Sequence, residues 1–165
     1  MKELLLLRHA KSSWDNVNLG DINRPLNEKG QADAPLMGEQ IANLNFIPQI
    51  IFSSTAQRTR ETIALVCETA HLPMEKVSYE TELYTFDFED VLRFIVSISD
   101  EFERVMMVGH NPAYTFLFNF LSDDTIENLP TCGACLLRFD VEKWADLKHK
   151  KGETLWIGSP RMFYP

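Results

Sequence analysis

A run of four leucines near the N-terminus, residues 4–7, ends in Arg8 and His9. A short, uninterrupted apolar run of this kind is typical of a strand that is buried on both faces of a parallel sheet. In open α/β sheets, ligands bind beyond the carboxyl ends of such strands. Arg8 therefore offers a permanent positive charge, and His9 a ring nitrogen, where the fold is expected to bind a ligand. Taken alone, Arg8 and His9 are weak evidence for a ligand site, because polar residues also commonly mark the end of a strand.

Two further apolar runs end in polar residues of the same kind. Residues 105–108 lead into His110, which by itself would be interpreted as a strand-terminal cap, and a helix-like segment follows Pro112. Residues 49–54 lead into a second helical segment that carries Arg58 in its first turn. A positive charge there opposes the helix dipole unless an anion is near. The position of Arg58 therefore indicates an anionic ligand.

These motifs, taken in order, resemble those of the histidine phosphatase superfamily, also called the phosphoglycerate mutase-like superfamily. The closest likeness is to its small SixA-type phosphohistidine phosphatases. The resemblance covers about three quarters of the chain and rests on Arg8-His9, Ser53-Ser54 with Arg58, Gly109-His110-Asn111-Pro112, and the stretches 21–30, 33–38 and 82–84.

The resemblance implies that His9 is the nucleophile and forms a phosphohistidine intermediate, and the residue types support this chemistry. Phosphoryl transfer depends mainly on holding and neutralising negative charge on the equatorial oxygens. Arg8 and Arg58 can each grip two oxygens and stay charged at any working pH. Their charge favours the neutral, nucleophilic form of His9. His110 would complete the cage by donating a hydrogen bond to the phosphoryl group, and backbone amides after Pro112 could add to it.

Two further residues are assigned through the resemblance. Ser12 matches a position that lines the phosphate site in relatives. Glu82 resembles the place where larger relatives carry an acidic catalyst, although an exposed glutamate at a strand end explains it equally well. We expect Asp15 to point away from the phosphate and Arg60 to lie on the opposite side of its helix from Arg58.

The composition indicates one compact domain over residues 1–165, with 45% hydrophobic and 24% charged residues. A formal net charge of −8 argues against a nucleic-acid partner. No segment has the length of a membrane helix, so we expect a cytoplasmic protein.

Cys132 and Cys135 have zinc-like spacing but no second pair, and arginine and histidine already supply positive charge. We therefore expect no metal and no cofactor, and activity that resists chelators.

The order of elements predicts a three-layer α/β/α sandwich with a mainly parallel central sheet, and the resemblance implies the same fold. Helices are expected over about 28–44, capped by Asn27 and kinked or divided at Pro35, over 55–69, and over 88–98 after the cap Asp87. Further strands are expected over 77–79, 134–139 and 154–158.

The chain is too short for the insertions that form a lid in larger relatives. A shallow, lidless site suits a phosphohistidine on another protein better than a small metabolite. A general small-molecule phosphomonoesterase and a non-catalytic phosphate-binding module remain the alternatives. Replacement of Glu82 would distinguish a phosphomonoesterase from a phosphohistidine phosphatase, since it should harm ester hydrolysis more than phosphohistidine hydrolysis. An intact nucleophile beside its stabilising residues favours the enzyme over the binding module.

Overall fold

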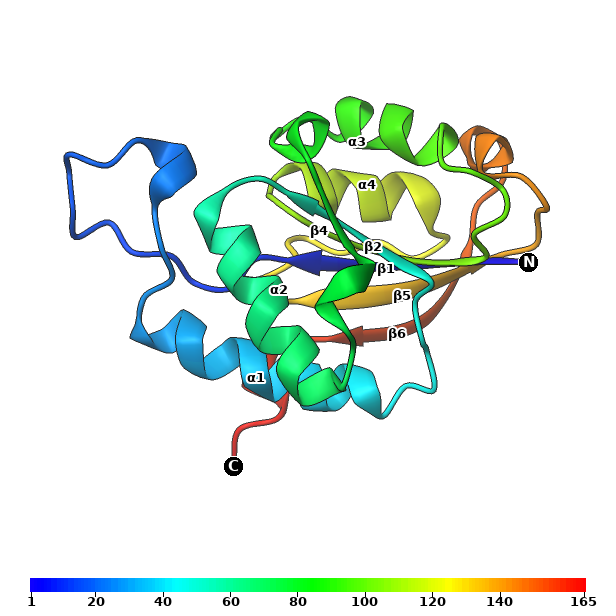
Figure 1. Cartoon of the computed structure of the whole chain (residues 1–165). Coiled ribbons are helices and arrows are strands. Elements are labelled where there is room, and N and C mark those ends of the chain that lie inside the picture. The colour runs from blue at the N-terminus through cyan, green and yellow to red at the C-terminus, as the bar shows by residue number, and fades with distance from the viewer.

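A central six-stranded sheet with two helices on each face forms the body of the protein (Figure 1). The computed structural model describes all 165 residues, Met1–Pro165. The strands are β1 (Lys2–Arg8), β2 (Ile50–Ser54), β3 (Val77–Glu80), β4 (Arg104–Gly109), β5 (Ala134–Phe139) and β6 (Glu153–Gly158). The helices are α1 (Glu28–Ala42), α2 (Gln57–Ala70), α3 (Phe88–Val96) and α4 (Ala113–Leu121), with five short 3-10 turns between elements. This arrangement confirms the three-layer α/β fold.

The strands lie in the order β3-β2-β4-β1-β5-β6. The first four run parallel to one another, whereas β5 is antiparallel to β1 and β6 is antiparallel to β5. The sheet is therefore mainly parallel, as expected, with an antiparallel pair along one side. Helices or 3-10 turns link the four parallel strands, because a parallel neighbour requires a crossover connection.

Alternate side chains of β1 enter two separate cores. Leu4 and Leu6 pack with α3 and α4 on one face, and Leu5 and Leu7 pack with α1 and α2 on the other. All four leucines are fully buried. Burial on both faces explains why this strand is apolar at successive positions rather than at every second one.

The helix boundaries differ from expectation in two places. Pro35 lies inside α1 and does not divide it, although Asn27 caps the helix as predicted by accepting a hydrogen bond from the Gly30 amide at 2.9 Å. The second helix begins at Gln57 and not at Thr55, with Ala56 at its N-cap. Ser54 stabilises this start from before the helix, because its hydroxyl oxygen accepts from the Ala56 amide at 3.2 Å.

The carboxyl ends of β1, β2 and β4 meet at one edge of the sheet. Arg8 is paired with Gly109, and Ser53 with Val108, so the residues that follow these strands emerge together. The connection from β1 to α1 projects from this edge as an extended loop, coloured dark blue at the left of Figure 1. Its 3-10 turn at Asp21–Asn23 returns toward the start of α2. None of the helices has the length and apolar character needed to cross a bilayer.

Candidate active site

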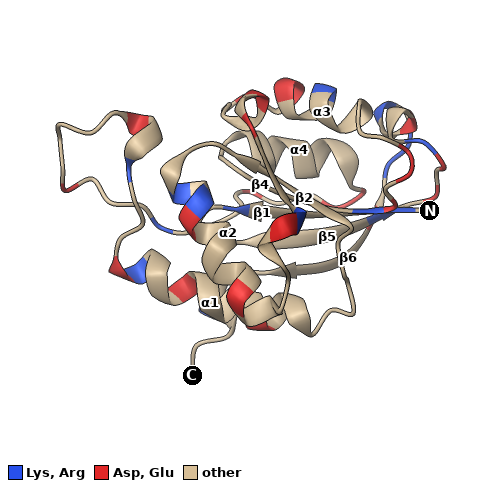
Figure 2. Ribbon diagram, viewed as in Figure 1, with Lys and Arg blue, Asp and Glu red and all other residues tan.

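A hollow of about 300 Å³ lies at this edge of the sheet, between the ends of the parallel strands and the projecting loop. Lysine and arginine residues occur along the end of β1, the loop and the first turns of α2, on a chain that is acidic as a whole (Figure 2). The residues that line the hollow are Arg8, His9, Lys11, Ser12, Trp14, Asp21, Arg24, Arg58, Phe86, Asn111 and Thr131.

His9 follows the last residue of β1 and is only 7% exposed. Its Nδ1 lies 2.6 Å from the carbonyl oxygen of Ala10, which can only accept a hydrogen bond. Nδ1 therefore carries the proton, and Nε2 retains the lone pair. Burial lowers the pKa of His9 to about 3, and the charges of Arg58 and Arg8 lower it further, whereas the hydrogen bond that His9 donates to the Ala10 carbonyl acts to raise it. The ring is neutral at physiological pH, as a nucleophile must be.

Arg58 in the first turn of α2 is 1% exposed and faces the loop. Its Nη1 donates to the backbone oxygen of Asp21 at 2.8 Å, and its Nη2 contacts the Asp21 carboxylate at 3.0 Å. The unfavourable position of Arg58 against the helix dipole is thus offset by an acidic side chain of the protein itself.

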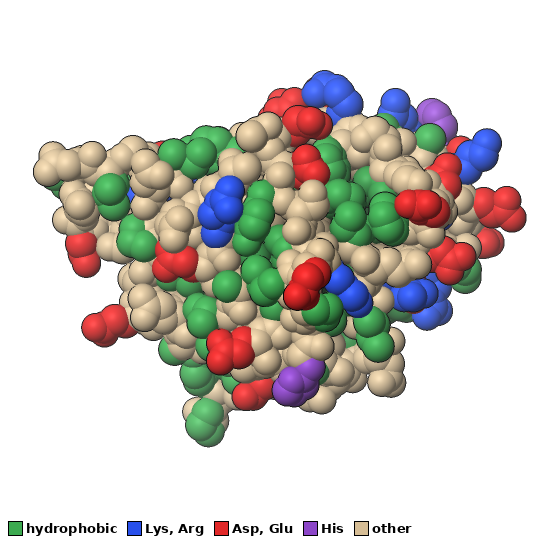
Figure 3. Space-filling view, in the orientation of Figure 1, with side chains coloured by type: hydrophobic (Ala, Val, Ile, Leu, Met, Phe, Trp, Pro, Cys, Tyr) green, Lys and Arg blue, Asp and Glu red, His purple; other side chains and the backbone are tan.

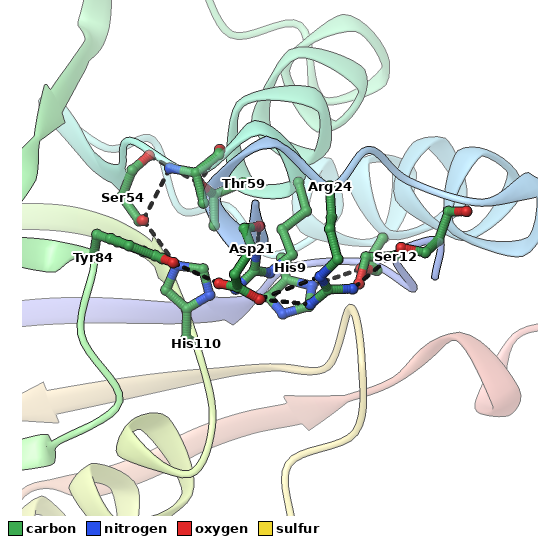
Figure 4. Close-up of polar contacts among 12 residues, drawn as sticks. His9, Ser12, Asp21, Arg24, Ser54, Thr59, Tyr84 and His110 are labelled. Atoms are coloured by element: carbon green, nitrogen blue, oxygen red, sulfur yellow. Dashed lines mark hydrogen bonds and ion pairs between the residues drawn. The ribbon is translucent and has the colours of Figure 1, made fainter. Parts of the chain in front are cut away.

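Arg24 brings a third guanidinium to the site. Its Nη1 donates to the hydroxyl of Ser12 at 2.7 Å, and its Nε and Nη2 each lie 3.2 Å from Oδ1 of Asp21. The ring of Trp14 covers the guanidinium at 3.5 Å from its carbon to the ring centre. Figure 4 shows Asp21 between Tyr84 and Arg24, with His9 beside them.

His110 lies against His9, with the two ring centres 5.3 Å apart, and its Nε2 is 2.8 Å from the hydroxyl oxygen of Ser54. Burial lowers its pKa to about 2, with further contributions from His9 and Arg58. The rings of Tyr84 and Phe86 pack edge-on against it at 5.5 and 5.4 Å. His110 is therefore held as a neutral imidazole.

Three buried nitrogen atoms of this cluster have no hydrogen-bond partner: Nε of Arg8, Nε of Arg58 and Nδ1 of His110. Unpaired buried polar atoms are costly and call for a partner. Arg8 is otherwise tied by one bond from Nη1 to the Leu129 carbonyl at 2.9 Å. The cluster can therefore offer donors to a compact, tetrahedral oxyanion bound in front of Nε2 of His9.

The structure thus brings together five of the six residues that the sequence placed at the site: Arg8, His9, Ser12, Arg58 and His110. It does not bring Glu82 to them. Glu82 lies exposed in a 3-10 turn and lines a different hollow, together with Asp90, Arg93, Phe94 and Ser97. The short turn after β3 directs Tyr84 toward the site instead, and its hydroxyl donates to Asp21 at 2.5 Å.

Neither Asp15 nor Arg60 lines the His9 hollow. Asp15 is exposed and lies outside the lining of the His9 hollow, and Arg60 packs over the ring of Tyr79 at 4.0 Å. The expected contribution of amides at the start of α4 is partly wrong, because the Tyr114 amide donates to the His110 carbonyl and the Thr115 amide to the Asn111 side chain.

Asp21, Arg24 and Tyr84 were not predicted as site residues. All three fall in stretches that carry the family resemblance, and this was the only indication that the sequence offered. The loop that holds Asp21 and Arg24 has no regular periodicity, so their approach to Arg58 depends on tertiary packing.

The three cysteines are buried free thiols. Cys132 adopts a left-handed backbone conformation with φ of 57°, and its amide donates to the carbonyl of His9 at 2.9 Å. Its visible role is to hold the backbone that carries His9. No cluster of three or more histidine, cysteine or acidic side chains with an arrangement suited to a metal ion is present.

Two histidines and three arginines lie together at one edge of an α/β sheet, and these residue types suit the binding of an oxyanion. The sequence model of the histidine phosphatase superfamily, branch 1, matches residues 4–92, and the chain belongs to this superfamily. An uncharacterised chloroplast protein of Arabidopsis thaliana is 34% identical over 163 residues, covering 94% of this chain and 74% of that protein. An uncharacterised protein of Mycobacterium leprae is 29% identical and covers 94% of this chain and all of its own length.

Solved structures agree with this assignment. A protein assigned as phosphohistidine phosphatase SixA from Agrobacterium tumefaciens has a TM-score of 0.77 at 27% identity, with 96% of this chain and 98% of that chain covered. The protein histidine phosphatase SixA in complex with tungstate has a TM-score of 0.82 at 20% identity, with 98% and 99% covered. The likeness to the tungstate complex concerns the fold alone.

Proposed function

We propose that this protein is a phosphatase that removes a phosphoryl group through a phosphohistidine intermediate on His9, and that its substrate is a phosphohistidine on another protein. One observation carries the proposal: a neutral histidine with a free Nε2 is enclosed by three guanidinium groups and a second neutral histidine. A nucleophile and charge-stabilising groups in one hollow are what phosphoryl transfer requires.

The reaction proceeds in two displacements. Nε2 of His9 attacks phosphorus in line, so that a P–N bond to His9 forms as the bond to the leaving group breaks, and the leaving group takes up a proton. Water then attacks the phosphohistidine, which releases inorganic phosphate and returns His9 to its neutral form. Arg8, Arg58 and Arg24 neutralise the charge on the equatorial oxygens, and Nδ1 of His110 donates to one of them.

The surroundings of the hollow favour a phosphoryl group that is carried by a protein. Large hydrophobic side chains are exposed at the hollow and on the projecting loop: Trp14, which lines the hollow, is 71% exposed, and Val17 on the loop is 90% exposed. Hydrophobic side chains are visible on the projecting loop at the left of Figure 3. Leu19, Ile22 and Phe86 are further members of this set. Exposed apolar side chains near a charged hollow are typical of a surface that contacts another protein.

A direct test compares two substrates. Phosphate release is measured from a protein phosphorylated on histidine and from p-nitrophenyl phosphate, for the wild type and for His9→Ala. We expect release from both in the wild type, a higher kcat/KM for the phosphohistidine protein, and no release in the variant. A higher kcat/KM for the ester would support a small-molecule phosphomonoesterase. If the wild type hydrolysed neither, the binding-module alternative would replace this proposal.

A further inference from the structure

The Asp21 carboxylate occupies the arginine groups that a phosphoryl group would need. Its Oδ2 receives hydrogen bonds from Nη2 of Arg58 at 3.0 Å and from the Tyr84 hydroxyl at 2.5 Å. Its Oδ1 lies 3.2 Å from both Nε and Nη2 of Arg24. The Asp21 carboxylate is thus surrounded by two guanidinium groups and a hydroxyl, as a bound oxyanion would be. Here the anion belongs to the chain itself.

The hydrogen bonds of Arg58 are directed entirely to this residue. Nη1 contacts the backbone oxygen of Asp21, Nη2 contacts its carboxylate, and Nε is buried without a partner. Asp21 and Arg58 both line the hollow, so a phosphoryl group on Arg58 would stand beside the Asp21 carboxylate, and the two anions would repel each other. Phosphoryl binding and the Asp21–Arg58 ion pair therefore compete for the positive charge of the same guanidinium.

The segment that carries Asp21 is weakly anchored by packing. The carboxylate belongs to the 3-10 turn Asp21–Asn23, in which no residue is buried, and the Asp21 side chain is 40% exposed. Burial of the carboxyl group would raise its pKa, but hydrogen bonds from Tyr84 and Arg58 outweigh this and hold the pKa at about 2. The group is thus a charged carboxylate held mainly by polar contacts, which another anion can replace.

A phosphoryl dianion has two advantages over this carboxylate. Its charge is greater, so its attraction to two guanidinium groups is stronger at equal distance. It also has more acceptor oxygens, and three buried donors of this cluster, Nε of Arg8, Nε of Arg58 and Nδ1 of His110, have no partner while Asp21 is in place.

We propose that Asp21 is an internal competitor for the phosphoryl site: the incoming phosphoryl group displaces its carboxylate from Arg58, and the carboxylate returns when inorganic phosphate leaves. This inference rests on the proposed function only in that the hollow binds a phosphoryl group. The carboxylate orders the arginines in the free protein and limits inhibition by the product. Asp21 thereby lowers the affinity of the site for phosphate and speeds phosphate release.

The first measurement is the affinity for inorganic phosphate by isothermal titration calorimetry at pH 7.5. Asp21→Asn keeps the size of the side chain but removes its charge, and we expect phosphate to bind about tenfold more tightly, as loss of one charge-assisted contact in the competing state implies. Tyr84→Phe removes one bond to Asp21 while keeping the ring against His110, and should tighten binding by about twofold to fivefold. Asp15→Asn, on the same loop but outside the hollow, is the matched control and should stay within about twofold.

The second measurement distinguishes displacement from simple charge repulsion. A crystal structure of the wild type with tungstate or orthovanadate should show the anion on Arg58 and the Asp21 carboxylate no longer in contact with that guanidinium. Unchanged or weaker phosphate binding in Asp21→Asn would overturn the proposal, and so would an anion complex in which the Asp21–Arg58 ion pair persists. Neither measurement depends on turnover, so a chain that binds phosphate but hydrolyses nothing would disprove the proposed function and leave this inference standing.

Discussion

The hydroxyl oxygen of Ser54 lies 2.8 Å from Nε2 of His110, so one of these two groups donates a hydrogen bond to the other. The same oxygen already accepts a hydrogen bond from the Ala56 amide at 3.2 Å, so its own proton is available to the ring. We infer that Nε2 of His110 accepts and that the proton resides on Nδ1, the buried nitrogen without a partner. Ser54 thereby makes His110 a donor toward the phosphoryl site.

Ser54→Ala should consequently lower kcat/KM about tenfold, because His110 loses the bond that fixes its tautomer. The expected cause can be checked by ¹⁵N NMR of the ring, which should show a mixture of tautomers in the variant and one in the wild type. Ser53→Ala is the matched control, since Ser53 is equally buried but donates to the Ser54 carbonyl at 2.9 Å. An equal loss of activity in both variants would assign the effect to packing and not to the tautomer.

The two site histidines make stability depend on pH in a defined direction. The pKa values of His9 and His110 are lowered to about 3 and about 2, whereas an unfolded histidine titrates near the ordinary value. Between these values the unfolded chain takes up protons that the folded chain does not, so stability falls as the pH is lowered below about 6.5. Each histidine should cost about 2 kcal/mol of unfolding free energy between pH 7 and pH 5.

Urea unfolding at pH 7 and pH 5 measures this loss, and His9→Asn isolates the part that belongs to His9. The variant has no imidazole at this position, so its loss between the two pH values should be smaller than that of the wild type by about 2 kcal/mol. An identical pH dependence in both proteins would show that His9 takes up a proton in the folded state over this range.

Much of the fold could be predicted because the central strands can be identified from their apolar composition. Leu4–Leu7 and Val105–Val108 are apolar at successive positions, which only a strand covered on both faces tolerates, and both runs are fully buried. The direction of β5 and β6 was not predicted, because the side-chain pattern of a strand is the same for parallel and antiparallel neighbours. Strand direction follows from the connections, and the segment between α4 and β5 contains no crossover helix.

The site was predictable where a residue directly follows a regular element. His9 and His110 follow strands, and Arg58 occupies the first turn of a helix, so the topology alone brings them to one edge. Asp21 and Arg24 reach the site through an irregular loop, whose path depends on contacts with residues far away in the sequence, such as the 3.0 Å ion pair to Arg58. Residue type and spacing do not encode such contacts.

Close contact between α1 and α2 depends on Gly38. A Cβ atom at this position would meet the Thr69 hydroxyl and lie within 2.5 Å of the Val66 carbonyl oxygen, which belongs to the backbone of α2 and cannot yield cheaply. Gly38→Ala should therefore lower the unfolding free energy by about 1–3 kcal/mol through overpacking. Urea denaturation measures this, with Gly20→Ala as a control, because no heavy atom lies within 4 Å of a Cβ there. Equal stabilities of the two variants would contradict the close packing.

Glu82 provides the sharpest comparison between a role expected from sequence and the position found in the structure. It is exposed and lines a hollow with Asp90 and Arg93, whereas Asp21 and Tyr84 border the site. Its carboxyl group does not line the hollow that holds His9, whereas a general acid must lie within hydrogen-bond reach of the leaving group. We expect Glu82→Gln to retain kcat/KM within about twofold for both a phosphohistidine protein and p-nitrophenyl phosphate, as surface substitutions usually do. A loss of more than tenfold confined to the ester would restore Glu82 as the general acid and require the turn after β3 to move when substrate binds.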